Sequence, residues 1–256
     1  MLLTRFNDSD SGTIIEIGID EAGRGSFWGP IMAGAFIIPP QTEWTEKQKE
    51  LFSQLRDSKK ITPKKRENLF DLINECIVEK GVGIVTSNEI NENGISWANQ
   101  EAFRRAVKAI PCINTVELNL KDYRLIIDGV LPISDWNCNQ ELIVEGDGKY
   151  LAIAGASILA KVSHDRWIID YCSKNTECTE RYDLEKSKGY GTAKHREGIR
   201  VYGGHELHRT LYIQNWLPDV EPVIKKKRVK KSSSSNESNR NVVGKEECEE
   251  KCLIKF

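Results

Sequence analysis

The sequence predicts a mixed α/β fold in which a five-stranded sheet is flanked by helices. Short runs of aliphatic and β-branched residues, each of strand length, alternate along the chain with longer runs that have helical periodicity. The first three strand-like runs suit an antiparallel meander. The last two follow helical stretches, and such connections suit strands that run parallel to a neighbour in the same sheet.

Local patterns place the elements in order. The first strand covers residues 13–20, where alternation puts Ile15, Ile17 and Ile19 on one face. A helix is expected to begin at Pro63, because proline is favoured in the first helical turn. The chain is expected to end its folded part with further helices after residue 190. The other predicted strands are 32–39, 81–87, 123–129 and 141–146, and the principal predicted helices are 63–79, 96–110 and 153–172.

Composition changes near Pro222. Residues 222–256 are poor in apolar side chains and contain a basic block (225–231), a serine run and a Glu-rich end. Such a segment buries too little apolar surface to offset the entropy that it would lose on ordering. We therefore predict an N-terminal extension (1–12), a folded domain (13–221) and a disordered tail (222–256).

Charge is divided unevenly between the tail and the rest of the chain. Ten Lys and Arg stand against five Asp and Glu in the tail, and 27 against 33 elsewhere. An acidic body argues against binding nucleic acid by bulk charge, because nonspecific affinity comes from neutralising phosphates with Lys and Arg. Contacts with nucleic acid would need local basic patches or metal ions. The basic block is typical of a nuclear-import signal or a tethering patch, and a solubilising tail is an equal alternative.

The cysteines and apolar runs indicate a cellular setting. Seven scattered cysteines without a C-x-x-C motif are most simply reduced thiols. The longest apolar runs are far shorter than a membrane span, and the N-terminus lacks the features of a signal peptide. We expect an intracellular monomer that does not enter a membrane. It would be cytoplasmic by default, or nuclear if the basic block directs import.

Carboxylates recur at the ends of the predicted strands. Asp20 and Glu21 close the first strand, Asp128 closes the fourth, and Asp147 follows the fifth. These acids would converge if the three strands are neighbours, because sites in open sheets form beyond the carboxyl ends of strands. Mg²⁺ or Mn²⁺ would relieve their repulsion, and two such ions can hold a phosphodiester and activate a water. Any one of these acids, taken alone, is more simply a turn or cap residue.

Two glycines follow the first acid pair and flank Arg24. Alternation would direct Asp20 and Glu21 to opposite faces, so both reach one site only if the strand ends there. Gly23 and Gly25 would allow such an abrupt end, and we expect a positive φ at Gly25. A dinucleotide-binding turn fits poorly, because the third glycine of that fingerprint is missing and two acids would repel a pyrophosphate.

Six segments of the chain follow one another in the order found in a known family. They are GIDEAGRGSFWGPIMAGAFII, LRDSKKITPKKRENLF, IIDG, EGDGKYLAIAGASILAKVSHDR, KGYGT and HRTLY, within about residues 13–216. They resemble type 2 ribonucleases H (ribonuclease HII). The resemblance implies a ribonuclease H fold and an endonuclease that cuts the RNA strand of RNA/DNA hybrids. It also implies action on single ribonucleotides in duplex DNA. If the turn reads the ribose while the acids act on its phosphate, we expect cleavage on the 5′ side of that ribonucleotide. Attack by a metal-bound water would leave 3′-hydroxyl and 5′-phosphate ends.

The resemblance also assigns roles to residues. It implies that the four strand-end acids bind two Mg²⁺ or Mn²⁺ ions with substrate, and that the turn and a tyrosine contact the sugar. Asp165 is a rival for the fourth acid, although an Asp beside Arg166 on a helix is more simply structural. The implied metal ligands are Asp20, Glu21, Asp128 and Asp147, and the implied substrate contacts are Gly23, Arg24, Gly25, Tyr190, Lys59, Lys60 and Lys161.

The chain departs from the family pattern near its C-terminal end. Ser187 stands where the family commonly has His, and Leu211 stands where it has Ser. Three histidines lie in the same region, and we expect them at the surface or facing phosphate: His195, His205 and His208. Two other functions remain open, a nuclease of the same fold that acts on DNA, such as a junction resolvase, and an inactive nucleic-acid-binding module.

Overall fold

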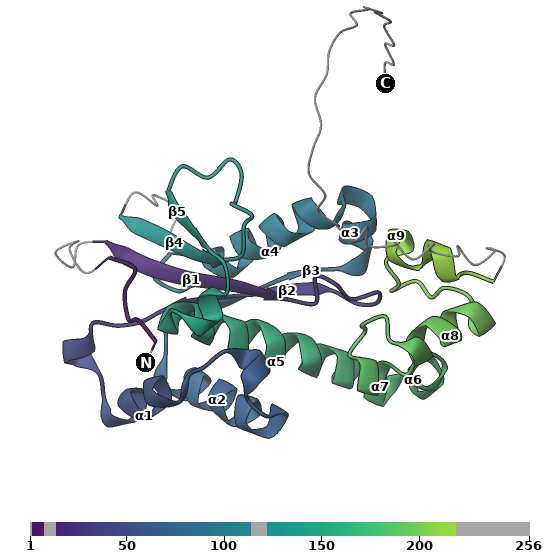
Figure 1. The fold of residues 1–256 in the computed structure, drawn as a ribbon, viewed down its shortest axis with the longest axis horizontal. Helices are drawn as coiled ribbons and strands as arrows, with labels where there is room; N and C mark the ends of the chain where they lie inside the picture. The colour runs from purple at the N-terminus through teal and green to yellow at the C-terminus, as the bar shows by residue number, and fades with distance from the viewer. Residues whose placement is uncertain (1, 8–13, 114–121, 219–256) are drawn as a thin grey trace, which may run out of the picture. The chain divides into compact units, whose positions relative to one another are not determined.

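A five-stranded mixed sheet is the centre of the fold (Figure 1). The order of strands is β3-β2-β1-β4-β5. The pairs β1–β2 and β2–β3 are antiparallel, and β1–β4 and β4–β5 are parallel. The predicted meander and the predicted parallel additions are therefore both confirmed. The strands are β1 (Ile15–Ala22), β2 (Ile31–Ile37), β3 (Lys80–Val85), β4 (Tyr123–Asp128) and β5 (Asn139–Ile143).

The computed structural model describes residues 2–7, 14–113 and 122–218. The predicted tail at 222–256, with its basic block, lies outside these residues, as do residues 1 and 8–12 of the predicted extension. No helix in the described ranges has the length and apolar character needed to cross a membrane. The five described cysteines are free thiols, as expected: Cys76, Cys112, Cys138, Cys172 and Cys178.

Helices begin and end close to the predicted positions. Pro63 does begin its helix, and the predicted helix at 63–79 stops at Cys76 because Ile77 has an extended backbone. The last predicted strand is wrong at its end: it stops at Ile143, and Glu145 has a left-handed backbone. The helices are α1 (Glu46–Gln54), α2 (Pro63–Cys76), α3 (Ser87–Asn93), α4 (Ile95–Lys108), α5 (Leu151–Lys174), α6 (Thr176–Tyr182), α7 (Leu184–Ser187), α8 (Ala193–Tyr202) and α9 (Thr210–Ile213), with 3₁₀ turns η1 (Gln41–Glu43), η2 (Ser58–Lys60), η3 (Gly146–Gly148) and η4 (Gln214–Trp216).

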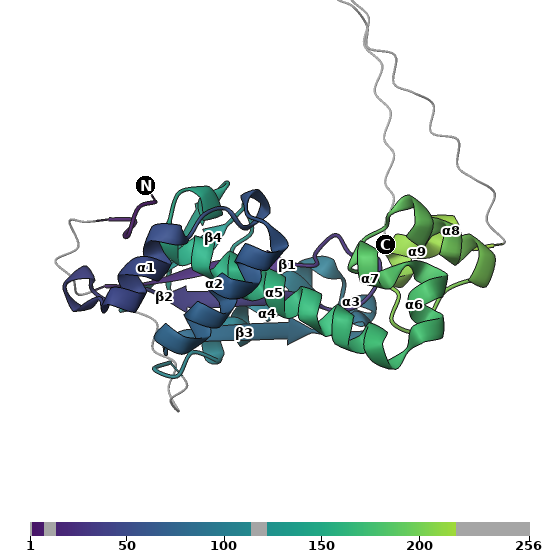
Figure 2. The ribbon, with the colours of Figure 1, turned by 90° about the horizontal axis from the view of Figure 1, so that it is seen from below.

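Helices cover both faces of the sheet. In Figure 1, α4 lies above the sheet and α5 lies below it together with α1 and α2. Helix α5 approaches the sheet backbone closely, because a Cβ atom at Gly18 would lie 2.2 Å from the Ala152 carbonyl carbon. Figure 2 shows α5 crossing the sheet and continuing toward α6 and α7. The N-terminal half of α5 is therefore held against the middle of β1.

A third apolar cluster joins the β1–β2 loop to the C-terminal helices. Trp28, from that loop, is fully buried and packs with side chains of α5, α7 and α8. Its ring centroid lies 4.6 Å from that of Tyr171. In Figure 1 the purple β1–β2 loop extends beyond the sheet toward the yellow-green α9. The loop thus leaves the sheet and enters the C-terminal part of the fold.

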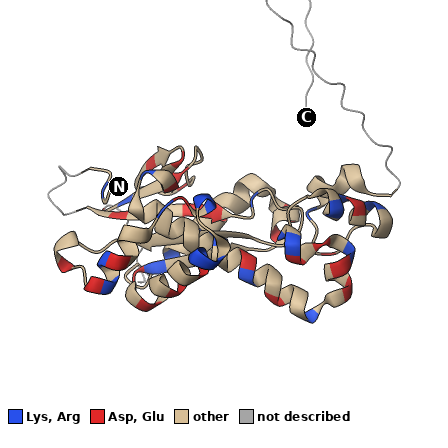
Figure 3. Ribbon diagram, turned by 60° about the horizontal axis from the view of Figure 1, so that its bottom comes forward, with Lys and Arg blue, Asp and Glu red and all other residues tan. Residues whose placement is uncertain are grey.

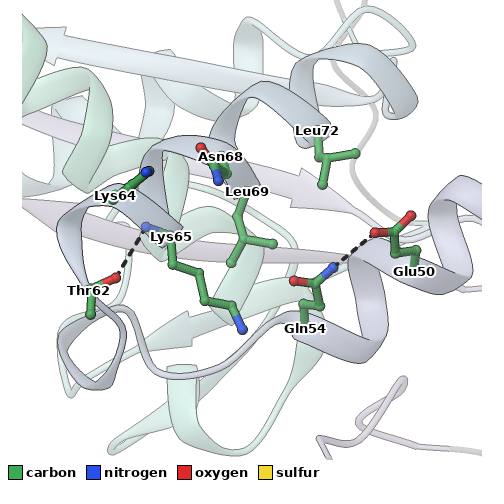
Figure 4. Close-up of a pocket in the computed structure, with 8 residues that line it drawn as sticks. All are labelled: Glu50, Gln54, Thr62, Lys64, Lys65, Asn68, Leu69 and Leu72. Carbon is green, nitrogen blue, oxygen red and sulfur yellow. Dashed lines mark hydrogen bonds between the residues drawn. The ribbon is translucent and has the colours of Figure 1, made fainter.

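An open pocket of about 450 Å³ lies between α1 and α2 (Figure 4). Two hydrogen bonds lie within its lining: the Lys65 amide donates to Thr62 Oγ1 at 3.3 Å, and Gln54 Nε2 donates to Glu50 Oε1 at 3.4 Å. No residue with a predicted catalytic or substrate-binding role lines this pocket. The site must therefore be built from the sheet outward.

Candidate active site

The predicted acids gather where β1 runs past the end of β4. Pairing of these two strands stops at Ile19↔Ile127, so Asp20 follows the last paired residue of β1 and Asp128 ends β4. Strand β1 itself continues to Ala22 along β2, two residues beyond the predicted range 13–20. The parallel arrangement of β1 and β4 therefore brings acids from two distant segments to the same edge of the sheet.

Charges of the acids act on one another across this edge. Burial, then the charges of Glu21 and Asp128, raise the pKa of Asp20 well above its usual range. The pKa of Glu21 is raised by burial and by Asp128, against the charge of Arg24. Asp20 is 5% exposed and accepts a hydrogen bond from the Glu21 amide at 2.7 Å. Like charges gathered in a buried place favour protonation or a bound cation.

Asp147 completes the group from the turn that precedes α5. The Gly146 amide donates to Asp128 Oδ1 at 2.7 Å, which ties the two acidic segments together. Asp147 is 4% exposed, and its Oδ2 is buried without a hydrogen-bond partner in the described residues. Burial, and then the charges of Asp57 and Asp128, raise its pKa to about 6. An orphaned carboxylate oxygen beside other acids suits a hard cation.

The acidic side chains of this group lie too far apart to form a metal site as they stand. Among residues 2–7, 14–113 and 122–218, no three His, Cys, Asp or Glu side chains are grouped closely enough to hold an ion. The chemistry of the donors fits Mg²⁺ or Mn²⁺, because both ions prefer carboxylate oxygen. An ion would therefore have to draw these carboxylates together.

Lys59 belongs to the acidic group, whereas Lys60 does not. Partial burial opposes the charge on Lys59, yet the pKa of its amine is raised. Lys60 instead pairs with Asp57 at 3.1 Å, and its side chain is 77% exposed. The carboxylates that raise the Lys59 pKa are, in order of effect, those of Asp147, Asp20, Asp128 and Asp57.

Asp57 is a fifth acid at this edge, and the sequence patterns did not single it out. It caps η2 and accepts a hydrogen bond from the Lys59 amide at 2.9 Å. Its charge also acts on Asp147 and is, after burial, the largest cause of the raised pKa of that carboxyl group. Burial would raise the pKa of Asp57, but bonds from Lys59 and Lys60 outweigh it and lower that pKa. Of these two acids, Asp147 is therefore the one that favours the protonated form.

The glycine turn contacts Tyr190 through its first residue. The Gly23 amide donates to Tyr190 Oη at 3.3 Å. The expected positive φ at Gly25 is wrong: Gly23 has φ of 83°, and Gly25 is not among the positive-φ residues. A Cβ atom at Gly23 would lie 2.5 Å from the His164 ring, whereas one at Gly25 would meet only Tyr190 Cε1, at 4.0 Å. The sharp bend and the close packing thus both fall on Gly23.

Lys161 and Asp165 form an ion pair beside Tyr190. Lys161 Nζ lies 2.7 Å from Asp165 Oδ1 and 5.4 Å from the centroid of the Tyr190 ring. Asp165 also lies 3.3 Å from His164 Nδ1. The expected neighbour of Asp165, Arg166, instead binds Glu67 and Asp71 of α2. Asp165 is thus placed with Lys161 and Tyr190, while Asp147 interacts with Asp128.

Comparison with known proteins decides the family. The model of the family described as Ribonuclease HII matches residues 17–215. The chain is 40% identical over 210 residues to the ribonuclease HII of Fusobacterium nucleatum subsp. nucleatum, covering 82% of this chain and 90% of that protein. The chain belongs to the ribonuclease HII family. It is a type 2 ribonuclease H, an endonuclease that acts on RNA/DNA hybrids.

Other members and solved structures agree. The ribonuclease HII of Caldicellulosiruptor bescii is 38% identical over 200 residues, 78% of this chain and 87% of that one. The crystal structure of ribonuclease H2 from Pyrococcus horikoshii OT3 matches with a TM-score of 0.59 at 25% identity, covering 79% of this chain and 97% of that one. Bst-RNase HIII in complex with Mn²⁺ matches with a TM-score of 0.58 at 17% identity, covering 80% and 70%. The predicted ribonuclease H fold is confirmed.

Two of the three histidines expected at the surface of this ribonuclease HII are buried, which corrects the expectation for His195 and His208. His195 and His208 are 0% and 1% exposed, with their Nε2 atoms 3.0 Å apart. His195 Nδ1 donates to the Tyr190 carbonyl at 3.0 Å, and His208 Nδ1 accepts from the His205 amide at 2.7 Å. Burial lowers the pKa of His195 to about 4 and that of His208 to about 3. This neutral pair fixes the backbone of Tyr190.

The departures from the family pattern also lie near the turn. Ser187 is buried, and its Oγ accepts a hydrogen bond from the Gly189 amide at 3.3 Å. Leu211 is 66% exposed, and the adjacent Tyr212 donates from its hydroxyl to the Arg24 carbonyl at 3.1 Å. Both positions thus belong to the part of this ribonuclease HII that surrounds the glycine turn.

Proposed function

We propose that this ribonuclease HII cuts the RNA strand of hybrids and also cuts on the 5′ side of single ribonucleotides in duplex DNA. A water molecule would attack the phosphodiester, leaving 3′-hydroxyl and 5′-phosphate ends. The observation that carries the proposal is the group of interacting acids at the carboxyl end of β1 and β4, with the orphaned Asp147 Oδ2 among them.

The acids would hold the ions. Asp20, Glu21, Asp128 and Asp147 would bind Mg²⁺ or Mn²⁺, two ions when substrate is present. Such ions, when bound, polarise a water and stabilise the leaving oxygen. The donor set supports this assignment, and so does the solved relative Bst-RNase HIII, whose crystal structure is a complex with Mn²⁺. Asp147, whose pKa is raised, would have to be deprotonated to bind the ion.

The glycine turn would contact the ribose and so select the ribonucleotide. The 2′-hydroxyl distinguishes a ribonucleotide from its DNA neighbours, so selection requires backbone groups and a ring close to that sugar. Gly23, Arg24 and Gly25 lie beside Tyr190, which is held by the Gly23 amide. Tyr190 would pack on the following deoxyribose. Arg24 and Lys161 would contact phosphates near the turn, and Lys59 and Lys60 would do so near the acids.

Phosphate contact by a few local residues agrees with the distribution of charge. Figure 3 shows acidic and basic segments interspersed along the described ribbon, rather than one sign covering the visible side. Arg24 is exposed, and Lys60 is paired only with Asp57 among the described ion pairs. We further propose that the enzyme is an intracellular monomer, in the cytoplasm or, through the basic block, in the nucleus.

The test uses three duplexes of one sequence: all DNA, DNA with one ribonucleotide, and DNA paired with an all-RNA strand. Each is incubated with Mg²⁺, with Mn²⁺ and with chelator. We expect cleavage of the second and third duplexes only, stopped by chelator, with the break 5′ of the single ribonucleotide. Cleavage of the DNA duplex would favour the resolvase-like alternative. Binding without cleavage of any duplex would favour the inactive module.

A further inference from the structure

The buried guanidinium of Arg209 donates hydrogen bonds to the β1–β2 loop, which carries the glycine turn. Arg209 is 1% exposed, and among the described residues it forms no ion pair with a carboxylate. Its donors go to three backbone carbonyls of the β1–β2 loop: Nη1 to Arg24 at 2.9 Å, Nη2 to Pro30 at 2.8 Å, and Nε and Nη2 to Gly29 at 3.1 Å each. Arg209 therefore ties the start of the loop to its end.

Burying an arginine without a counter-ion costs free energy, because its charge loses its hydration. A buried charge is tolerated only where hydrogen bonds replace the lost water, and here carbonyl oxygens do so. Burial lowers the pKa of Arg209 to about 10, so the group stays charged near neutral pH. An apolar side chain could fill the same space, but it could not direct three carbonyls toward one point.

A second donor from the same segment reaches the same carbonyl. Tyr212 Oη donates to the Arg24 oxygen at 3.1 Å, and the Arg209 guanidinium lies 5.6 Å from the centroid of the Tyr212 ring. The Arg24 carbonyl thus accepts hydrogen bonds from two side chains that follow it by 185 and 188 residues. Both of its lone-pair directions are used, which fixes the orientation of the carbonyl.

Fixing this carbonyl also fixes an amide of the turn. The Arg24 carbonyl and the Gly25 N–H belong to one planar trans peptide, so they point in opposite directions. In the described residues no protein acceptor is found for the Gly25 N–H. The peptide is therefore clamped on its carbonyl side, and its amide is presented on the side away from Arg209.

We propose that Arg209 and Tyr212 are positioning residues that aim the Gly25 amide at the ribonucleotide. Selectivity for a single ribonucleotide then depends on the C-terminal segment 209–212 as well as on the turn. The inference rests on the proposed function, because it assigns the Gly25 amide to the sugar–phosphate of that nucleotide. Both side chains would act through the Arg24 carbonyl and not by contact with the substrate or the acids.

The test variant is Tyr212→Phe, which removes one hydroxyl and keeps the ring. Tyr202→Phe is the matched control, because Tyr202 is 55% exposed on α8 and its ring contacts Arg181. Arg209→Lys keeps the charge and loses the forked geometry. Each protein is assayed for kcat and KM on the single-ribonucleotide duplex and on the all-RNA hybrid, and its thermal melting is recorded.

We expect Tyr212→Phe to lower kcat on the single-ribonucleotide duplex by roughly threefold to tenfold, about the worth of one hydrogen bond. The loss on the all-RNA hybrid should be smaller, because every position there offers a 2′-hydroxyl. Arg209→Lys should lower kcat on the single-ribonucleotide duplex further than Tyr212→Phe does. If the Arg209→Lys protein does not fold, the result for Tyr212→Phe alone tests the inference. An unchanged kcat for Tyr212→Phe, or an equal loss on both substrates, would overturn the inference.

A second readout does not depend on activity. In substrate-free protein, Tyr212→Phe should shift the amide ¹H and ¹⁵N resonances of Gly25, and Tyr202→Phe should not. An unshifted Gly25 resonance would overturn the clamp even if cleavage of single ribonucleotides is established. Failure of the parent enzyme to cut that duplex, with Gly25 shifted as expected, would instead overturn only the proposed function.

Discussion

The acid group and the glycine turn adjoin one another, but they are held by different means. Asp20 and Asp128 are placed by backbone pairing of adjacent strands, and Asp147 by the turn into α5. The glycine turn leaves the sheet and is held by side chains from the C-terminal part, chiefly Arg209 and Tyr212. Because the two regions are held differently, one substitution should be able to impair cleavage without changing selectivity for the ribonucleotide, and another the reverse.

The largest effect is expected from the acid group. Asp20→Asn and Asp128→Asn should each lower cleavage of hybrid below detection, because each removes a charge needed to hold the ions. The folded state should be retained, and thermal melting without metal should rise for Asp20→Asn, since burial of that carboxylate raises its pKa. Near-normal turnover by both variants would contradict the proposed metal ligands.

Asp165→Asn is the matched control for that prediction. It removes a carboxylate that pairs with Lys161, and it should leave cleavage largely intact. Complete loss of cleavage in Asp165→Asn, together with an active Asp147→Asn, would transfer the role of fourth acid to Asp165.

A smaller effect, divided between stability and selectivity, is expected from the two glycines of the turn. Gly23→Ala should lower the free energy of unfolding by about 1–3 kcal/mol, because its φ is 83° and its Cβ would meet the His164 ring. Gly25→Ala should change it by less than about 0.5 kcal/mol, yet lower kcat/KM on the single-ribonucleotide duplex. Urea unfolding and steady-state kinetics measure both. An equal loss of stability would show that the two positions are not distinguished in this way.

The smallest effect is expected from the proton on Asp147. The pKa of the Asp147 carboxyl group is raised to about 6 in the folded protein, against about 4 in the unfolded chain. Protonation of this group therefore stabilises the metal-free fold fully below about pH 4. That contribution is lost as the pH rises through about 6. Buried His195 and His208 act in the opposite sense. The measurement is therefore the difference in melting temperature between parent and Asp147→Asn, which should move in favour of the variant from pH 4 to 7. A constant difference would contradict the raised pKa.

The sequence predicts the acid group better than the turn, and the reason is physical. Strand alternation and connection lengths are local, so the antiparallel meander and the parallel additions could be anticipated, and with them an edge shared by Asp20 and Asp128 if their strands are neighbours. Helix α3 could not be anticipated, because Ile90 is its one apolar residue and its sequence has no helical periodicity of apolar residues. Asp57 was not predicted to belong to the acid group either, although it lies in the segment LRDSKKITPKKRENLF, which resembles the family.

The turn depends on contacts that no local pattern contains. Which glycine takes the positive φ is decided by His164 and Tyr190, more than 140 residues away. The histidines were expected at the surface or facing phosphate, but His195 and His208 are buried and share a hydrogen bond between their Nε2 atoms. Side-chain clamps between distant segments become visible only in the structure.

Equilibrium binding by two variants tests the separation of the two regions most directly. Asp128→Asn and Tyr190→Ala are compared with the parent for affinity toward Mn²⁺ alone, and for binding of the single-ribonucleotide duplex over the all-DNA duplex in chelator. We predict that Asp128→Asn loses Mn²⁺ affinity and keeps the preference for the ribonucleotide, whereas Tyr190→Ala keeps Mn²⁺ affinity and loses that preference. Loss of both properties in both variants would contradict the account, because it would show that the acids and the turn act as one unit.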